Sequence, residues 1–126
     1  MKRIIAALIV FAIAAAVAVS SNILVLKRVE VLSGDTRVLV EAAETKNQES
    51  ARAGLERLNT SWEKSDTILH MFVIHREMNE VELSVHALEE YLNGGDWELF
   101  REGSVRMLEA LAHIRHSQEL SLKNIF

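Results

Sequence analysis

Apolar residues recur at alternating spacings of four and three along most of this chain, which is the pattern of helices that bury one face. The clearest series lies in residues 51–75, and its members are Ala51, Leu55, Leu58, Trp62, Ser65, Leu69 and Phe72. Trp62 is the largest side chain of the series, and we expect it to pack in a core rather than to bind a ligand.

Three further segments carry the same rhythm, so the pattern predicts four helices around one core. Their positions are Val25, Val29, Leu32, Thr36, Leu39 and Ala43 in the first, Val81, Val85, Leu88 and Leu92 in the second, and Phe100, Ser104, Met107, Leu111 and Ile114 in the third. The fold class is therefore all-α. Short connections predict an antiparallel bundle, either up-down-up-down or as two stacked helical hairpins.

Polar residues and glycines set the expected helix ends. Residues 47–50 are predicted to form the turn into the segment 51–75. Asn79 with Glu82 three residues later forms a capping-box pattern, which predicts a helix start after a turn at residues 75–78. Residues 93–95, Asn-Gly-Gly, are expected to end that helix.

Three details complete the predicted outline of the bundle. Asp96 is expected to cap the last helix. Gly34 leaves two alternatives open for the first helix, a kink or break and an uninterrupted helix. The tail at residues 117–126 carries four large apolar side chains and is expected to fold back onto the bundle.

The N-terminal segment is apolar on all sides. Residues 4–19 include no polar side chain, and the 23 residues from 4 to 26 are long enough to cross a hydrocarbon layer of ~30 Å as a helix. We therefore predict a transmembrane anchor at residues 1–26 and a helical bundle domain at 27–126. A signal peptide is the alternative, because Ala16, Val17 and Ala18 offer the small residues of a cleavage site.

The predicted location is the cell membrane, with a single pass. Lys2 and Arg3 precede the apolar segment and Lys27 and Arg28 follow it, so the basic residues nearly balance. The short N-terminal tail favours an N-terminus inside and a domain on the extracytoplasmic side.

Composition narrows the classes of partner. The 126-residue chain has a formal charge of -4 and lacks cysteine and proline. The part beyond the predicted anchor carries about -6, with no basic stripe bearing interleaved aromatic residues, so nucleic acid is not an expected partner. The absence of cysteine excludes disulfides and thiolate-ligated metals. No cofactor is expected.

Histidines supply the candidate chemistry. Glu109, His113 and His116 have a spacing that could direct three ligands at one metal ion, but such spacing is frequent in charged helices, and we expect these histidines to be partly exposed. A second candidate is the corner formed by His75, Glu77 and Asn79. His75 is expected to interact with the C-terminal end of the preceding helix.

The chain resembles an uncharacterised family, domain-of-unknown-function family 4363. The residues that carry the resemblance are the basic start and apolar helix, Trp62, His75, Glu77, Asn79, Glu82, Leu88, Tyr91, Leu92, Asp96, Trp97, His113, Ile114 and the ending at residues 119–126. The resemblance implies a small, membrane-anchored helical protein of Gram-positive, often spore-forming bacteria. It implies no activity.

Together these observations predict a non-enzymatic interaction or scaffold module at the cell envelope, whose partners are the membrane and another protein. Carboxylate pairs such as Glu89 and Glu90 point in different directions on a helix and do not define an acid–base site. The alternative is a ligand- or metal-sensing bundle that uses His75 or His113 and His116. No small-molecule ligand is indicated by the sequence.

Overall fold

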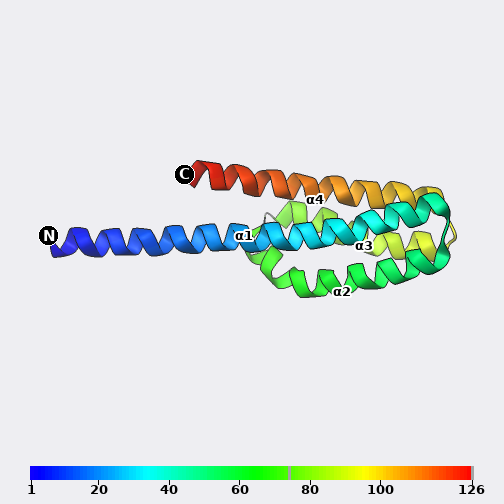
Figure 1. Ribbon diagram of the computed structural model, residues 1–126, viewed down its shortest axis with the longest axis horizontal. Helices are drawn as coiled ribbons and strands as arrows, with labels where there is room; N and C mark the ends of the chain where they lie inside the picture. The colour runs from blue at the N-terminus through cyan, green and yellow to red at the C-terminus, as the bar shows by residue number, and fades with distance from the viewer. Residues whose placement is uncertain (74, 126) are drawn as a thin grey trace.

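The computed structural model describes residues 1–73 and 75–125, and within them it consists of four helices and no strand. The helices are α1 (Lys2–Thr45), α2 (Gln48–Phe72), α3 (His75–Asn93) and α4 (Trp97–Ile125). Figure 1 shows them lying side by side, with the N-terminal part of α1 projecting beyond the others. The predicted all-α bundle is confirmed.

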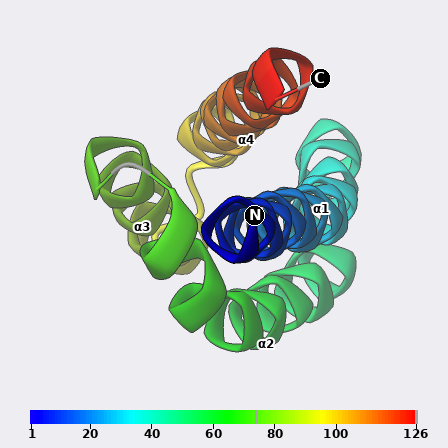
Figure 2. The ribbon, with the colours of Figure 1, turned by 90° about the vertical axis from the view of Figure 1, so that its left-hand side faces the viewer.

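The helices follow an up-down-up-down order around the bundle axis. α1 packs against α2 and α4, while α3 packs against α4 and less extensively against α2. Viewed from the N-terminal end in Figure 2, successive helices are neighbours and α1 and α3 do not pack against each other. This order follows from the short turns, because each helix must run antiparallel to the one before it.

The core consists of the helix faces on which apolar residues recur at spacings of four and three. All the predicted positions of α1, α3 and α4 are buried, and so are those of α2 from Ala51 to Leu69, Trp62 among them. Three of these positions are hydroxyl residues, each of which donates to the carbonyl four residues earlier: Thr36 to Leu32 at 2.7 Å, Ser65 to Ser61 at 2.7 Å and Ser104 to Phe100 at 2.8 Å. Within the described residues no buried side-chain polar atom lacks a partner.

The first helix is uninterrupted at Gly34, so the alternative of a break there is wrong. The carboxylate of the next residue, Asp35, accepts a hydrogen bond of 2.7 Å from the Ser61 hydroxyl of α2. Asp35 therefore joins α1 to α2.

The predicted cap at Asp96 is confirmed, whereas the predicted turn at 47–50 is shorter because residues 48–50 already belong to α2. Lys46 ends α1 in the left-handed conformation, with φ of 53°, and the Asn47 side chain accepts a hydrogen bond from the Ser50 amide at 3.1 Å. At the other turn, Asp96 accepts from the Leu99 amide at 3.1 Å. The N-terminus of α2 is thus at Gln48, three residues before the predicted series begins.

The turn between α2 and α3 differs from the prediction. α2 ends at Phe72, Val73 is extended, and α3 begins at His75, so Asn79 lies inside α3 and caps nothing. Phe72 does not complete the core series and is 41% exposed, whereas Val73 is buried. Phe72 instead lines a shallow groove with Ile13, Val17 and Leu24 of α1, and the extended residue Val73 is buried.

The predicted fold-back of the tail is also wrong. α4 continues without interruption to Ile125, and Leu120 is 46% exposed. No glycine or proline follows Gly103 to end the helix, so the helix propagates through the polar residues of the tail. Phe126 and Ile74 lie outside the described residues.

The two halves of α1 have different surroundings. No residue in 2–21 is buried, and burial begins at Asn22 and Val25. In the described part of the chain, α1 is the one helix that is long and apolar enough to cross a membrane. None of its most apolar stretch is buried. A signal sequence fulfils the same criterion, and the division into an anchor at 1–26 and a bundle at 27–126 stays a prediction.

Candidate functional site

The corner predicted from His75, Glu77 and Asn79 is rearranged by the early start of α3. His75 is the first residue of α3 and is exposed, and its predicted interaction with the end of α2 stays a prediction. Asn79 is exposed on the second turn. Instead, His70 occupies the last turn of α2, where its Nδ1 lies 2.7 Å from an oxygen of Asp66.

Glu77 joins this corner to the other histidine cluster. One of its carboxylate oxygens lies 3.2 Å from Nε2 of His113 on α4. The Glu77 side chain is 14% exposed, whereas that of His113 is 68% exposed. Glu77 also lies in the first turn of α3, where the helix dipole favours a negative charge. The contact joins the first turn of α3 to α4.

The histidines of α4 do not gather into a three-ligand site. Within residues 1–73 and 75–125, no three histidine or carboxylate side chains are arranged so that they could hold a metal ion. His113 is turned towards Glu77, while Glu109 and His116 are exposed side chains without a contact to it. His113 thus takes part in a pairwise contact between α3 and α4.

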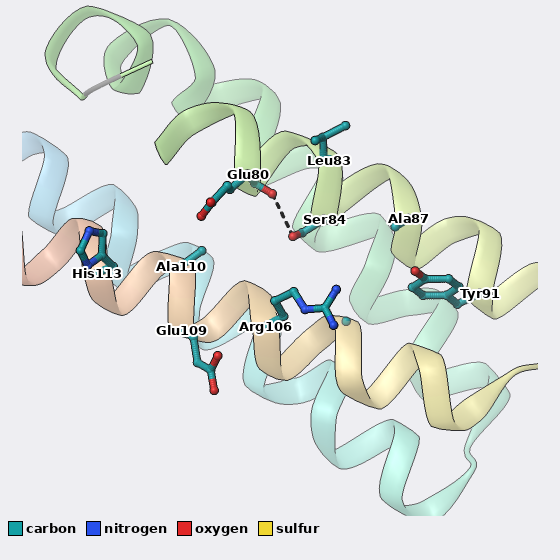
Figure 3. Close-up of a pocket in the computed structure, with 10 residues that line it drawn as sticks. Glu80, Leu83, Ser84, Ala87, Tyr91, Arg106, Glu109, Ala110 and His113 are labelled. Carbon is teal, nitrogen blue, oxygen red and sulfur yellow. Dashed lines mark hydrogen bonds between the residues drawn. The ribbon is translucent and has the colours of Figure 1, made fainter. Parts of the chain in front are cut away.

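A groove of about 560 Å³ runs between α3 and α4, and we call it the α3–α4 groove. The side chains that line it come equally from the two helices: Glu80, Leu83, Ser84, Ala87 and Tyr91 from α3, and Gly103, Arg106, Glu109, Ala110 and His113 from α4. Figure 3 shows Tyr91 towards one end and His113 towards the other. The site thus begins beside the Glu77–His113 contact.

Small residues keep the groove open. At Gly103 an added Cβ would lie 3.1 Å from Leu88 and 3.3 Å from the Tyr91 ring, so α4 approaches α3 closely at that point. Ala87 and Ala110 leave the space beyond it unfilled. Leu83, which is 61% exposed, adds an apolar side chain to the rim.

The polar groups of the groove are suited to binding. Ser84 donates its hydroxyl hydrogen to the Glu80 carbonyl at 2.9 Å within its own helix. Arg106 and Glu80 are both exposed. In Figure 3 the Arg106 side chain extends along the groove, whereas the Glu109 carboxylate points away from α3. An apolar floor with charged groups on its rim can accept an apolar side chain of a partner and orient it.

The family of this chain follows from the large part of it that a family model matches. Residues 19–125 match the model of a family described as Domain of unknown function (DUF4363). The chain belongs to this family. The DUF4363 domain thus includes all of the packed part of α1 together with α2, α3 and α4, and the resemblance seen in the sequence is confirmed. No curated protein and no solved structure matches the chain.

Sequence reasoning missed the main features of this DUF4363 site. The Glu77–His113 contact depends on the register between α3 and α4, which helical periodicity does not specify. The groove depends on Gly103 and Ala110 facing α3. A glycine inside a strongly helical segment was the available signal, since such a residue often marks a close approach of two helices.

Proposed function

We propose that this protein is a non-enzymatic, single-pass membrane protein whose DUF4363 bundle binds another protein at the cell envelope, on the extracytoplasmic side. The observation that carries the proposal is the projecting half of α1. Its 20 residues, 2–21, include none that the bundle buries, and a helix of that length measures about 30 Å, the thickness of a hydrocarbon layer.

Exposure to water would be costly for this segment. Large apolar side chains along it are more than half exposed, among them Ile4, Leu8, Val10, Phe11 and Val17. Each such side chain is stabilised by about 1.5–3 kcal/mol when it leaves water completely. A lipid bilayer provides that environment around the entire circumference of the helix, which one side of a partner protein does not.

The polar residues at the end of the segment fit a membrane boundary. Ser21 and Asn22 both donate to the Ala18 carbonyl, at 2.8 and 3.0 Å, so each side chain makes a hydrogen bond within the helix. Lys27 and Arg28 follow one turn later, where they can reach headgroups. The same helix then enters the bundle without a linker.

The α3–α4 groove supports the proposed binding role. It lies on the side of the bundle rather than in its core, and it combines an apolar floor with charged rim residues of both signs. These features are typical of a surface that receives a segment of another protein.

Membrane extraction tests the proposal. The full-length protein should stay in the membrane fraction during carbonate washing and be released by detergent, whereas a variant that lacks residues 2–21 should be soluble and folded by circular dichroism. A reporter active on only one side of the membrane, fused after Phe126, tests the orientation. Release of the full-length protein by carbonate, or reporter activity in the cytoplasm, would contradict the corresponding part of the proposal.

A further inference from the structure

The end of the bundle from which α1 projects differs in charge from the rest, and we call it the proximal end. It consists of residues 22–30, 66–73, 75–79 and 113–125, and it has five lysine and arginine residues against four aspartate and glutamate residues. The remainder of the bundle has seven against fourteen. Four of the five histidines, His70, His75, His113 and His116, also lie at the proximal end.

Two of the acidic residues at the proximal end are engaged. Asp66 contacts His70 at 2.7 Å, and Glu77 contacts His113 at 3.2 Å. The five basic residues there are Lys27, Arg28, Arg76, Arg115 and Lys123, and none of them forms an ion pair within the described residues. All five are exposed or partly exposed, so their charges are available to an anionic surface.

Apolar side chains are exposed at the same end. Met71 is 69% exposed and Phe72 is 41% exposed, at the last turn of α2. A shallow groove brings Phe72 beside α1, where its apolar wall includes Ile13, Val17 and Leu24. The end of α2 therefore lies at the level of the projecting half of α1.

The end of α4 reaches still farther along α1. After His113, α4 continues for twelve residues to Ile125, whereas α3 begins at His75, only two residues before Glu77. At 1.5 Å per residue, α4 extends about 15 Å beyond the start of α3. Figure 1 shows these last turns of α4 alongside α1, past the connection between α2 and α3.

We propose that the proximal end of the bundle is a second membrane-contact surface, which binds anionic phospholipid headgroups through Arg76, Arg115 and Lys123 and inserts Met71 and Phe72 into the interface. This inference rests on the proposed anchoring of α1. The continuous helix holds these groups at the depth where the bilayer begins, and basic residues near an anionic surface are attracted within a Debye length. The occupant is the bilayer that holds α1.

Depth-dependent quenching tests the proposal on the full-length chain. The protein lacks cysteine, so a single fluorophore can be attached at Met71→Cys, with Leu83→Cys and Leu99→Cys as matched controls on the side and far end of the bundle. In nanodiscs that contain phosphatidylglycerol and lipids spin-labelled near the headgroup, the fluorophore at position 71 should be quenched and those at 83 and 99 should not. Absence of quenching at position 71 overturns the inference.

A fourth label separates this inference from the anchoring on which it rests. A fluorophore at Phe11→Cys should be quenched by lipids spin-labelled deep in the acyl chain. Quenching at position 11 without quenching at 71 would leave the anchor in place and refute the second contact. No quenching at position 11 would refute the anchor itself.

Charge removal tests the role of the basic residues. Each lysine or arginine near an anionic surface strengthens association by roughly five-fold. The double variant Arg76→Gln with Lys123→Gln should reduce quenching at position 71 to the level seen in zwitterionic discs. The control, Arg37→Gln with Arg52→Gln, removes the same charge outside the proximal end and should leave quenching unchanged. Equal loss in both variants, or no loss in either, contradicts the assignment of these residues.

Discussion

The two halves of α1 share one backbone conformation and differ in everything that surrounds it. Residues 4–19 have no polar side chain and no residue in 2–21 is buried, whereas residues 22–45 bury one face and carry charges on the other. The contrast teaches that helicity and apolar content do not decide where a helix packs. The second half packs because its apolar positions follow a four-three spacing that α2 and α4 can cover.

The largest expected effect comes from truncating one leucine in each half. Leu39 is fully buried, so Leu39→Ala should lower the free energy of unfolding by about 2–5 kcal/mol. Leu8 is 63% exposed, and Leu8→Ala should leave the bundle as stable as before. Urea unfolding in detergent micelles, followed by circular dichroism, measures both. Equal losses would mean that the halves are not energetically distinct.

An arginine in the first half tests whether that half, unlike the second, cannot tolerate a charge. Phe11→Arg places a charge near the middle of the apolar segment, which costs about 2.5–3.5 kcal/mol for a helix centre in a bilayer. The variant should therefore move from the membrane fraction to the soluble or aggregated fraction. Val31→Arg, at an exposed position of the second half, should remain in the membrane. If both variants were lost from the membrane, the two halves of α1 would not differ in their tolerance of a charge.

Close packing is expected only in the second half. At Gly54 of α2, an added Cβ would lie 2.9 Å from Leu39, whose side chain is fully buried and has little room to move. Gly54→Leu should destabilise the bundle by about 1–3 kcal/mol, as overpacking does. Ala53→Leu adds apolar volume at the exposed neighbouring position and serves as the control in the same urea experiment.

The smallest effect is a stabilisation within α1. Gly34 is helical and has no atom within 4 Å of an added Cβ. Gly34→Ala should therefore raise the free energy of unfolding by about 0.5–1 kcal/mol, because alanine loses less backbone entropy than glycine in a helix. A decrease in the urea midpoint would indicate that α1 bends at this residue in solution.

Periodicity predicted the buried faces of this fold because a four-three series leaves few alternatives to a bundle. It predicted the helix ends less well. Asn79 and Glu82 have the spacing of a capping box, yet the extended backbone at Val73 allows α3 to begin at His75. The tail was expected to fold back because of its four large apolar side chains, although nothing in its sequence stops a helix that is already formed.

The site was less predictable than the fold, because it depends on the axial register of α3 against α4. Glu77 and His113 were each noted as candidates, in separate clusters, and their contact joins those clusters. A shift of one turn between α3 and α4 would preserve both buried faces and separate the pair. Sequence spacing within one helix carries no information about that shift.

The absence of a linker within α1 has a mechanical consequence. From Asn22 to Thr45 the helix rises about 36 Å at 1.5 Å per residue, so a bundle held by an inserted anchor would keep its far end at one height above the bilayer. A rotation of the anchor about its own axis would also turn the α3–α4 groove through the same angle. Successive residues of a helix are about 100° apart, so a change of one residue in the contact face of the anchor corresponds to a rotation of about 100°. Pairing or tilting of anchors within the lipid would thus decide the direction in which each groove faces.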